Sequence, residues 1–279
     1  MAMTMLASWI GIDPHGPTSA YIVGDSRFSW GLGSANKYFD YGKKVFASNL
    51  YPEAFGYAGD VLFPSIVLSQ IIEMIDMDIL FTNEFTCEQK NNTVYEKLRL
   101  AFSKYPDVLG TTNVIQILHI SRDTLFESYP SFYCYLMSWS KSTGWKVEEK
   151  KIPNTSDILF ILGSGKCEFI ANYSRYQSGP NEDTSRNVFH CFIDTLFNIK
   201  DPSCGGPPQL VGIYRKPESS AKNFGIIYQN KRYFLGAEVP RATYPNKIEW
   251  RNEFFELCDG GTKKVIKTAV KQPDLLRRK

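Results

Sequence analysis

The sequence predicts an α+β fold in four layers, a four-layer αββα sandwich of two antiparallel sheets flanked by helices. Strand-like and helix-like runs follow one another as strands, two helices, strands, two helices and strands. A doubly wound parallel sheet needs a regular alternation of strand and helix, so that alternative is disfavoured. The 279 residues are 43% hydrophobic, enough for a substantial core. Because no linker or internal repeat interrupts the chain, we expect residues 1–279 to form one domain.

The first strands form a predicted hairpin. Residues 4–12 and 18–24 are rich in alternating and β-branched positions. The turn-forming residues from Asp13 to Pro17 lie between them and indicate a reversal of the chain. Two more short strands are expected near 43–49 and 53–58.

Two helices should follow. The segment from Val61 to Leu80 is apolar on nearly every side, so it must be buried over most of its circumference. Asp60 can cap its beginning, and Pro64 falls in the first turn, where proline is tolerated. A second, more amphipathic helix is predicted from Tyr95 to Lys104.

The second half of the chain repeats the order of strands and helices. The apolar run from Asp157 to Leu162 indicates a buried strand, and Gly163-Ser164-Gly165 turns it toward a helix. The remaining expected elements are strands near 113–121, 131–139, 145–151, 208–215 and 223–235, and helices near 166–176 and 184–199.

Charge and composition exclude several classes of protein. The net charge of +3 is too small to indicate a nucleic-acid partner. The six cysteines lie far apart without a CxxC pair, and the three histidines lack metal-ligand spacing, so we expect reduced thiols and no metal. No apolar run approaches the roughly 20 residues that cross a bilayer, and no signal peptide is evident. We therefore expect a soluble cytoplasmic protein that uses no cofactor and does not bind membranes.

Four motifs follow one another along the chain: Gly24-Asp25-Ser26-Arg27, Lys44, Gly163-Ser164-Gly165 and Asp201-Pro-Ser-Cys204-Gly-Gly. In these motifs and their order the chain resembles proteasome β-type subunits and their bacterial two-component relative, over about 215 residues from Thr4 to roughly Arg215. Asp25, in Gly-Asp-Ser-Arg, matches the aspartate that ends the family's second strand. Lys44 matches the active-site lysine, and Gly163-Ser164-Gly165 resembles the turn whose serine assists the terminal amine. The resemblance implies the Ntn-hydrolase fold.

The fourth motif departs from the family pattern. Asp201-Pro-Ser-Cys204-Gly-Gly resembles the family's Asp-x-x-Ser-Gly-Gly, with cysteine in place of serine. Each motif alone has an ordinary structural explanation: Asp25 can form a turn, Lys44 can end a strand, and Ser164 can cap a helix. Their joint occurrence in order is what carries the resemblance.

The resemblance implies a threonine hydrolase that cuts peptide bonds. As the first residue, Thr4 would supply a hydroxyl nucleophile and an α-amine base, whose pKa of about 8 suits neutral pH. Lys44 would favour the alkoxide, and Asp25 would hold the lysine. The backbone N–H of Gly59 would stabilise the oxyanion.

Further expectations come from the same resemblance. Tyr57 and Val61 would flank the pocket for the residue before the cut bond. Family members form rings, so we expect a homo-oligomer. No nucleotide motif is present, because Gly163-Ser-Gly-Lys166 lacks the other Walker residues, so any ATPase unfoldase would be a separate protein. Residues from about 216 to 279 form an extension that we cannot match to the family.

Two alternatives stay open. Thr4 follows Met1-Ala2-Met3 and must be exposed before it can act; if synthesis starts at Met3, methionine removal would expose it. An alignment on Leu6 and Ala7 would instead put Met3 at the nucleophile position. The second alternative is a catalytically inactive scaffold or assembly subunit with the same fold.

Overall fold

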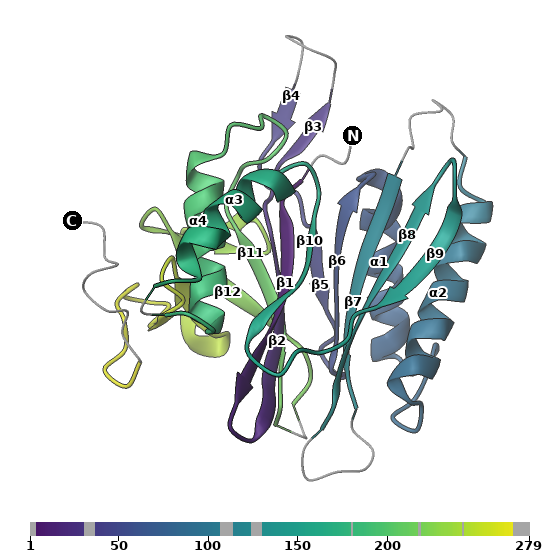
Figure 1. The fold of residues 1–279 in the computed structure, drawn as a ribbon, viewed down its shortest axis with the longest axis horizontal. Coiled ribbons are helices and arrows are strands. Elements are labelled where there is room, and N and C mark those ends of the chain that lie inside the picture. The colour runs from purple at the N-terminus through teal and green to yellow at the C-terminus, as the bar shows by residue number, and fades with distance from the viewer. Residues whose placement is uncertain are drawn as a thin grey trace.

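The four-layer fold predicted from the sequence is confirmed by a computed structural model (Figure 1). Two sheets lie face to face, and the four α-helices of the described residues lie outside them, the first two along the chain on one side and the last two on the other. The structure describes residues 4–30, 37–106, 114–123, 130–179, 181–216, 219–241 and 243–269.

The larger sheet contains the first hairpin and the strands of the carboxy-terminal part. Its neighbours are antiparallel along the path β10-β1-β2-β11-β12-β13-β14. β15 pairs with β12 in parallel and with β16 antiparallel. In path order the strands are β10 (Asp157–Leu162), β1 (Leu6–Asp13), β2 (Gly16–Gly24), β11 (Gln209–Tyr214), β12 (Lys222–Tyr228), β13 (Lys231–Phe234) and β14 (Ala237–Glu238), followed by β15 (Trp250–Asn252) and β16 (Leu257–Cys258).

The smaller sheet is an antiparallel meander of consecutive strands. A separate short hairpin of β3 (Phe28–Trp30) and β4 (Lys37–Phe39) projects from the body in Figure 1. The strands of the meander are β5 (Val45–Ala47), β6 (Glu53–Gly59), β7 (Val114–Arg122), β8 (Phe132–Ser140) and β9 (Gly144–Glu149).

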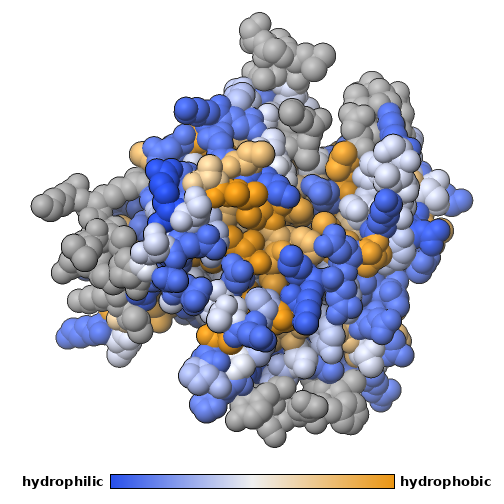
Figure 2. All heavy atoms as spheres, in the orientation of Figure 1, coloured by the Kyte–Doolittle hydropathy of each residue, from blue (hydrophilic) through white to orange (hydrophobic). Residues whose placement is uncertain are grey.

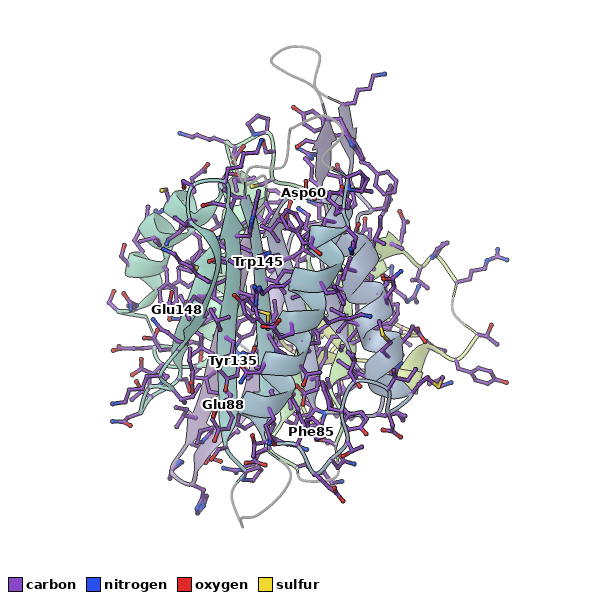
Figure 3. All side chains as sticks on the ribbon, turned by 90° about the vertical axis from the view of Figure 1, so that its right-hand side faces the viewer. Asp60, Phe85, Glu88, Tyr135, Trp145 and Glu148 are labelled. Carbon is purple, nitrogen blue, oxygen red and sulfur yellow. The ribbon has the colours of Figure 1, made fainter. Side chains whose placement is uncertain are left out.

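The helices cover the outer faces of the sheets. Helices α3 (Lys166–Tyr176) and α4 (Ser185–Asn198) lie outside the larger sheet. Helices α1 (Leu62–Asp76) and α2 (Cys87–Ser103) lie outside the smaller one, and Figure 3 shows them in front of its strands, with Asp60 at the beginning of α1. Within the described residues, every helix is too short or too polar to cross a lipid bilayer.

Strand β1 shows how the layers are built. Because side chains alternate along a strand, Leu6 and Ile10 enter the core between the sheets, whereas Ala7 and Trp9 enter the core under α3 and α4. All four are fully buried, which explains the continuous apolar character of this segment. Figure 2 shows apolar side chains gathered in the middle of one face, between the two sheets, with polar side chains around them.

Four local expectations differ from the structure. Helix α1 ends at Asp76 rather than at Leu80, just before Asp78, whose φ is 57°. Helix α2 begins at Cys87 rather than at Tyr95, because Thr86 forms a capping box with Gln89.

The other two differences concern strands. The single strand expected at 223–235 is two strands, β12 and β13, joined by Gln229 and Asn230 with φ of 49° and 59°. The β3–β4 hairpin was not expected. The described part of the extension from about 216 to 279 supplies β12 to β16.

Candidate active site

The ends of three strands bring together Thr4, Asp25 and Lys44. Thr4 lies just before β1 and Asp25 just after β2, and the pairing of Leu6 with Gly24 makes these two positions neighbours. Lys44 lies just before β5 in the opposite sheet. The site therefore lies at one end of the space between the two sheets.

The three side chains form one buried hydrogen-bonded cluster. The Thr4 hydroxyl donates to Asp25 Oδ1 at 2.7 Å, and Lys44 Nζ donates to the same oxygen at 2.7 Å. Lys44 Nζ also contacts Thr4 Oγ1 directly. The side chains of Asp25 and Lys44 are 0% and 1% exposed, so water screens this ion pair very little.

Backbone groups hold the Asp25 carboxylate in place. Oδ1 accepts from the N–H of Met5 at 3.1 Å, and Oδ2 accepts from the N–H of Gly205 at 3.0 Å and of Arg27 at 3.3 Å. A buried carboxylate needs such donors in addition to its counter-ion. These contacts fix the position of Asp25 relative to Lys44.

The turn after β10 packs against the backbone of Thr4. Gly165 N–H donates to Thr4 O at 3.1 Å. Gly163 has a φ of 87°, and a Cβ on this residue would lie 2.1 Å from Thr4 O. Only glycine fits here, because a side chain would displace the residue expected to act as nucleophile.

Ser164, Asp201 and Cys204 form a second group beside the first. The Cys204 thiol lies 3.6 Å from both Ser164 Oγ and Asp201 Oδ2. Burial opposes the charged form of Asp201, but hydrogen bonds from Ser164, Ser203 and Cys204 outweigh it and lower the pKa of the carboxyl. Burial, with the nearby Asp25 charge, raises the pKa of Cys204 to about 12, so Cys204 is a neutral thiol at physiological pH.

Gly59 ends β6 with a φ of 101°. Within β6 the Tyr57 N–H donates to Lys44 O at 3.1 Å. N–H groups two residues apart in a strand point to the same side, so the Gly59 N–H is directed to the same edge, away from β7. A backbone donor is therefore directed toward the side of β6 on which Lys44 lies.

The two residues expected to line a substrate pocket lie on either side of Gly59. Tyr57 is 1% exposed in the core under α1 and α2, and its hydroxyl donates to Lys43 O at 3.1 Å. Burial raises the pKa of Tyr57. Val61 is half-buried immediately before α1. Their contact with a substrate stays a prediction.

Two residues that support the site were not predicted from the sequence. Arg27 donates to both carboxylate oxygens of Asp40, at 2.7 and 2.9 Å, and to Cys204 O at 3.2 Å. Gln209 Nε2 donates to Asp25 O at 3.1 Å and to Gly42 O at 2.7 Å. Arg27 belongs to the Gly-Asp-Ser-Arg motif and could have been noticed, whereas Gln209 carries no local signal.

In the described ranges, no three His, Cys, Asp or Glu side chains converge as metal ligands do. The Thr4–Asp25–Lys44 cluster places a hydroxyl, a carboxylate and an ammonium in contact, an arrangement that can support proton transfer and nucleophilic attack.

At the sequence level, no protein-family model and no curated protein matches the chain. Solved structures do match its fold. The Anbu complex from Pseudomonas aeruginosa, described as a helical assembly, is 12% identical, with 78% of this chain and 85% of that chain covered and a TM-score of 0.53. Anbu from Yersinia bercovieri, described as an ancestral beta-subunit, is 11% identical, with 82% and 86% covered and a TM-score of 0.51.

A third match is BPH from Thiobacillus denitrificans in complex with epoxomicin, 14% identical over 76% of this chain and 100% of that one, with a TM-score of 0.48. At such low identity the likeness shows the fold of this chain and nothing finer.

Proposed function

We propose that this protein is an N-terminal threonine hydrolase that cleaves peptide bonds through Thr4 once residues 1–3 have been removed. One observation carries the proposal: the Thr4 hydroxyl contacts both the Lys44 ammonium and the Asp25 carboxylate in a buried cluster. A scaffold has no need of a buried lysine beside a threonine hydroxyl, since an ion pair costs desolvation free energy to bury.

The proposed reaction begins when the free α-amine of Thr4 takes the hydroxyl proton and Oγ1 attacks the substrate carbonyl carbon. Lys44 lowers the free energy of the developing alkoxide, and the Gly59 N–H donates to the oxyanion of the tetrahedral intermediate. The C–N bond then breaks, the leaving amine receives the proton, and an ester to Thr4 remains. Water then gives a proton to the α-amine and attacks the ester carbonyl carbon; the C–Oγ1 bond breaks, the carboxylic acid leaves, and Oγ1 takes the proton back from the amine.

In this proposal Ser164, Asp201 and Cys204 surround the α-amine. Gly165 holds the carbonyl of Thr4, so its neighbour Ser164 lies close to the new amino terminus. Because the pKa of Cys204 is raised to about 12, Cys204 serves as a hydrogen-bonding neighbour and does not replace the amine as base.

The test compares two forms of the chain. One form is produced with Thr4 as residue one, by cleavage of a removable tag, and the other retains residues 1–3. An epoxyketone needs both a hydroxyl and a free amine on one residue to close its ring, whereas a β-lactone acylates the hydroxyl. We expect intact-mass adducts of both probes on Thr4 only in the first form, and neither probe to react with a chain that begins with T4A.

Absence of both adducts from the form that begins at Thr4 would overturn the hydrolase and favour the inactive scaffold. An adduct on Cys204 in place of Thr4 would equally contradict the assignment of the nucleophile.

We also propose that the chain forms a homo-oligomer, since the Anbu complex of Pseudomonas aeruginosa is described as an assembly. The β3–β4 hairpin offers exposed aromatic side chains for such contacts: Trp30 is 55% and Phe39 46% exposed. Sedimentation velocity tests this, and a strictly monomeric chain at micromolar concentration would count against it. A separate ATPase that unfolds protein substrates is a further expectation from the same resemblance.

A further inference from the structure

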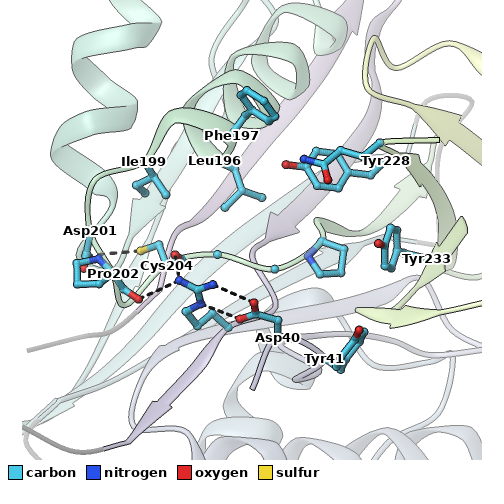
Figure 4. Close-up of a pocket in the computed structure, with 15 residues that line it drawn as sticks. Asp40, Tyr41, Leu196, Phe197, Ile199, Asp201, Pro202, Cys204, Tyr228 and Tyr233 are labelled. Carbon is cyan, nitrogen blue, oxygen red and sulfur yellow. Dashed lines mark hydrogen bonds and ion pairs between the residues drawn. The ribbon is translucent and has the colours of Figure 1, made fainter. Parts of the chain in front are cut away.

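A cavity of about 430 Å³, shown in Figure 4, is lined in part by Asp201 and Cys204 of the candidate active site. Its walls come from the end of α4, the Asp201–Gly206 loop, the foot of the β3–β4 hairpin and the β12–β13 turn. This volume falls within the range that holds small ligands or single side chains. Neither Thr4 nor Lys44 lines the cavity, but Asp201, Cys204 and Gly205 do, so the cavity adjoins the site of the proposed reaction and shares a wall with it.

The charged groups of the lining leave an excess of negative charge. The guanidinium of Arg27 donates hydrogen bonds to the Asp40 carboxylate and to the carbonyls of Pro202 and Cys204. Asp201, whose carboxyl pKa is lowered, adds a carboxylate without a cationic partner among these contacts. The cavity therefore carries two carboxylates against one guanidinium.

Helix α4 adds to this negative potential. It ends at Asn198, and Leu196, Phe197 and Ile199 line the cavity. The last carbonyls of a helix lack intrahelical donors and form the negative end of its dipole. The nearby Lys231 does not offset this charge, because its ammonium pairs with Glu238 at 3.2 Å.

Aromatic rings complete the walls. Tyr41, Phe197, Tyr228 and Tyr233 line the cavity, and Tyr41 and Phe197 are 48% and 52% exposed. Aromatic faces attract cations, and a planar guanidinium stacks on them better than an ammonium does. Excess negative charge and partly exposed aromatic side chains together favour a cation on a short apolar stem.

We propose that this cavity binds the basic side chain of a peptide, arginine in preference to lysine. A ligand bound in the cavity would also affect the candidate active site, because the two sites share a wall. The backbone N–H groups of Gly205 and Arg27 both donate to Asp25 Oδ2. A ligand that shifts the Asp201–Gly206 loop would thus shift the carboxylate that contacts Thr4.

Binding is tested on the full chain by ligand-observed NMR or calorimetry, without any activity assay. The probe is Nα-acetyl-arginine methylamide, and its neutral isostere, the citrulline derivative, is the ligand control. We expect the arginine probe to bind about fivefold or more tightly than the citrulline probe. Equal affinity for the two, or no arginine binding up to about 20 mM, would overturn the proposal.

Two variants localise the binding. Gln229 lines the cavity, and its neighbour Asn230 in the same turn does not; both are exposed and have positive φ. Q229K places an ammonium in the wall and should weaken arginine binding about fivefold, whereas N230K adds the same charge outside and should change it less than about twofold. Equal effects of Q229K and N230K would reject this cavity as the binding site. Because these readouts need no catalysis, the proposal can fail independently of the proposed hydrolase.

Discussion

At the scale of single residues, the central feature is a cation held with almost no water contact. Lys44 is 1% exposed, and its ammonium donates to Asp25 and contacts Thr4. Such a charge is tolerated only while its carboxylate partner is present, since an unpaired buried charge is costly. The stability of the fold and the proposed chemistry therefore depend on the same pair of residues.

We predict that K44M lowers the free energy of unfolding by about 3 kcal/mol or more, because it leaves the Asp25 carboxylate buried without a counter-ion. The double variant D25N/K44M should recover part of that loss, since neither charge remains. Neither variant should form a β-lactone adduct at Thr4. Urea unfolding and intact-mass analysis measure the two effects separately.

The prediction fails if K44M reacts with the probe as fast as the parent chain. It also fails if D25N/K44M is less stable than K44M, because the Lys44–Asp25 pair would then contribute nothing as a pair.

At the same scale, the motif resemblance predicted which residues meet but not what supports them. Apolar runs and turn residues place Thr4, Asp25 and Lys44 next to strand ends, and only the resemblance indicated that these ends lie together. Gln209 also contacts the backbone of Asp25, but it is distant in sequence and has no motif of its own. The cavity beside the Asp201–Gly206 loop also depends on how the β12–β13 turn folds back, which no local pattern specifies.

At the scale of elements, the predicted bounds were correct where the pattern of apolar residues and the turn-forming residues indicated the same boundary. Strand β10 was expected at its observed bounds, because an apolar run ends in Gly163-Ser-Gly. The start of α2 was missed because its first turns are polar, although the Thr86 and Gln89 capping box is a readable signal. The β12–β13 turn was missed because Gln229 and Asn230 reverse the chain without a glycine.

A substitution at Gly59 tests whether the turn between β6 and α1 requires glycine. The φ of Gly59 is 101°, and a Cβ would lie 2.3 Å from Val114 O. We predict that G59A costs about 2–3 kcal/mol of stability, from backbone strain together with displacement of β7. Gly144 is the matched control, since its φ is 65° but nothing would lie within 4 Å of an added Cβ, so G144A should cost only about 1 kcal/mol.

Urea unfolding of the two glycine variants measures the difference. Equal losses would mean that the contact with Val114 is relieved without cost, and the turn would then not require glycine for steric reasons. In that case the proposed oxyanion donor would lose its structural support.

At the scale of the whole molecule, the layered fold buries five of its six cysteine thiols. Burial is the main cause that raises the pKa of each of four cysteines to about 12; they are Cys87, Cys134, Cys191 and Cys204. In the unfolded chain a thiol has a pKa of about 8.5. Above that pH the unfolded chain releases protons that the folded chain retains, so alkaline conditions favour unfolding.

The sign and size of this effect follow from the proton balance. Stability from these thiols is fully present below about pH 8.5 and is lost as the pH rises toward 12, by about 1.4 kcal/mol per pH unit for each thiol. Cys134, 0% exposed between the two sheets, is the sharpest test. C134A should lower stability at pH 7.5 and also make its decline with pH shallower by about 1.4 kcal/mol per unit between about pH 9 and 11.

The control is C167A, because Cys167 is exposed and its surroundings change little on unfolding. Urea unfolding in a non-thiol reductant at several pH values gives the slopes. If the free energies of unfolding of C134A, C167A and the parent chain fall in parallel as the pH rises, the buried thiols do not cause the loss of stability at alkaline pH. If the free energy of unfolding of C134A alone falls less steeply with pH, the space between the sheets stays closed to water and hydroxide until the whole fold opens. The buried Lys44–Asp25 pair requires the same exclusion of water.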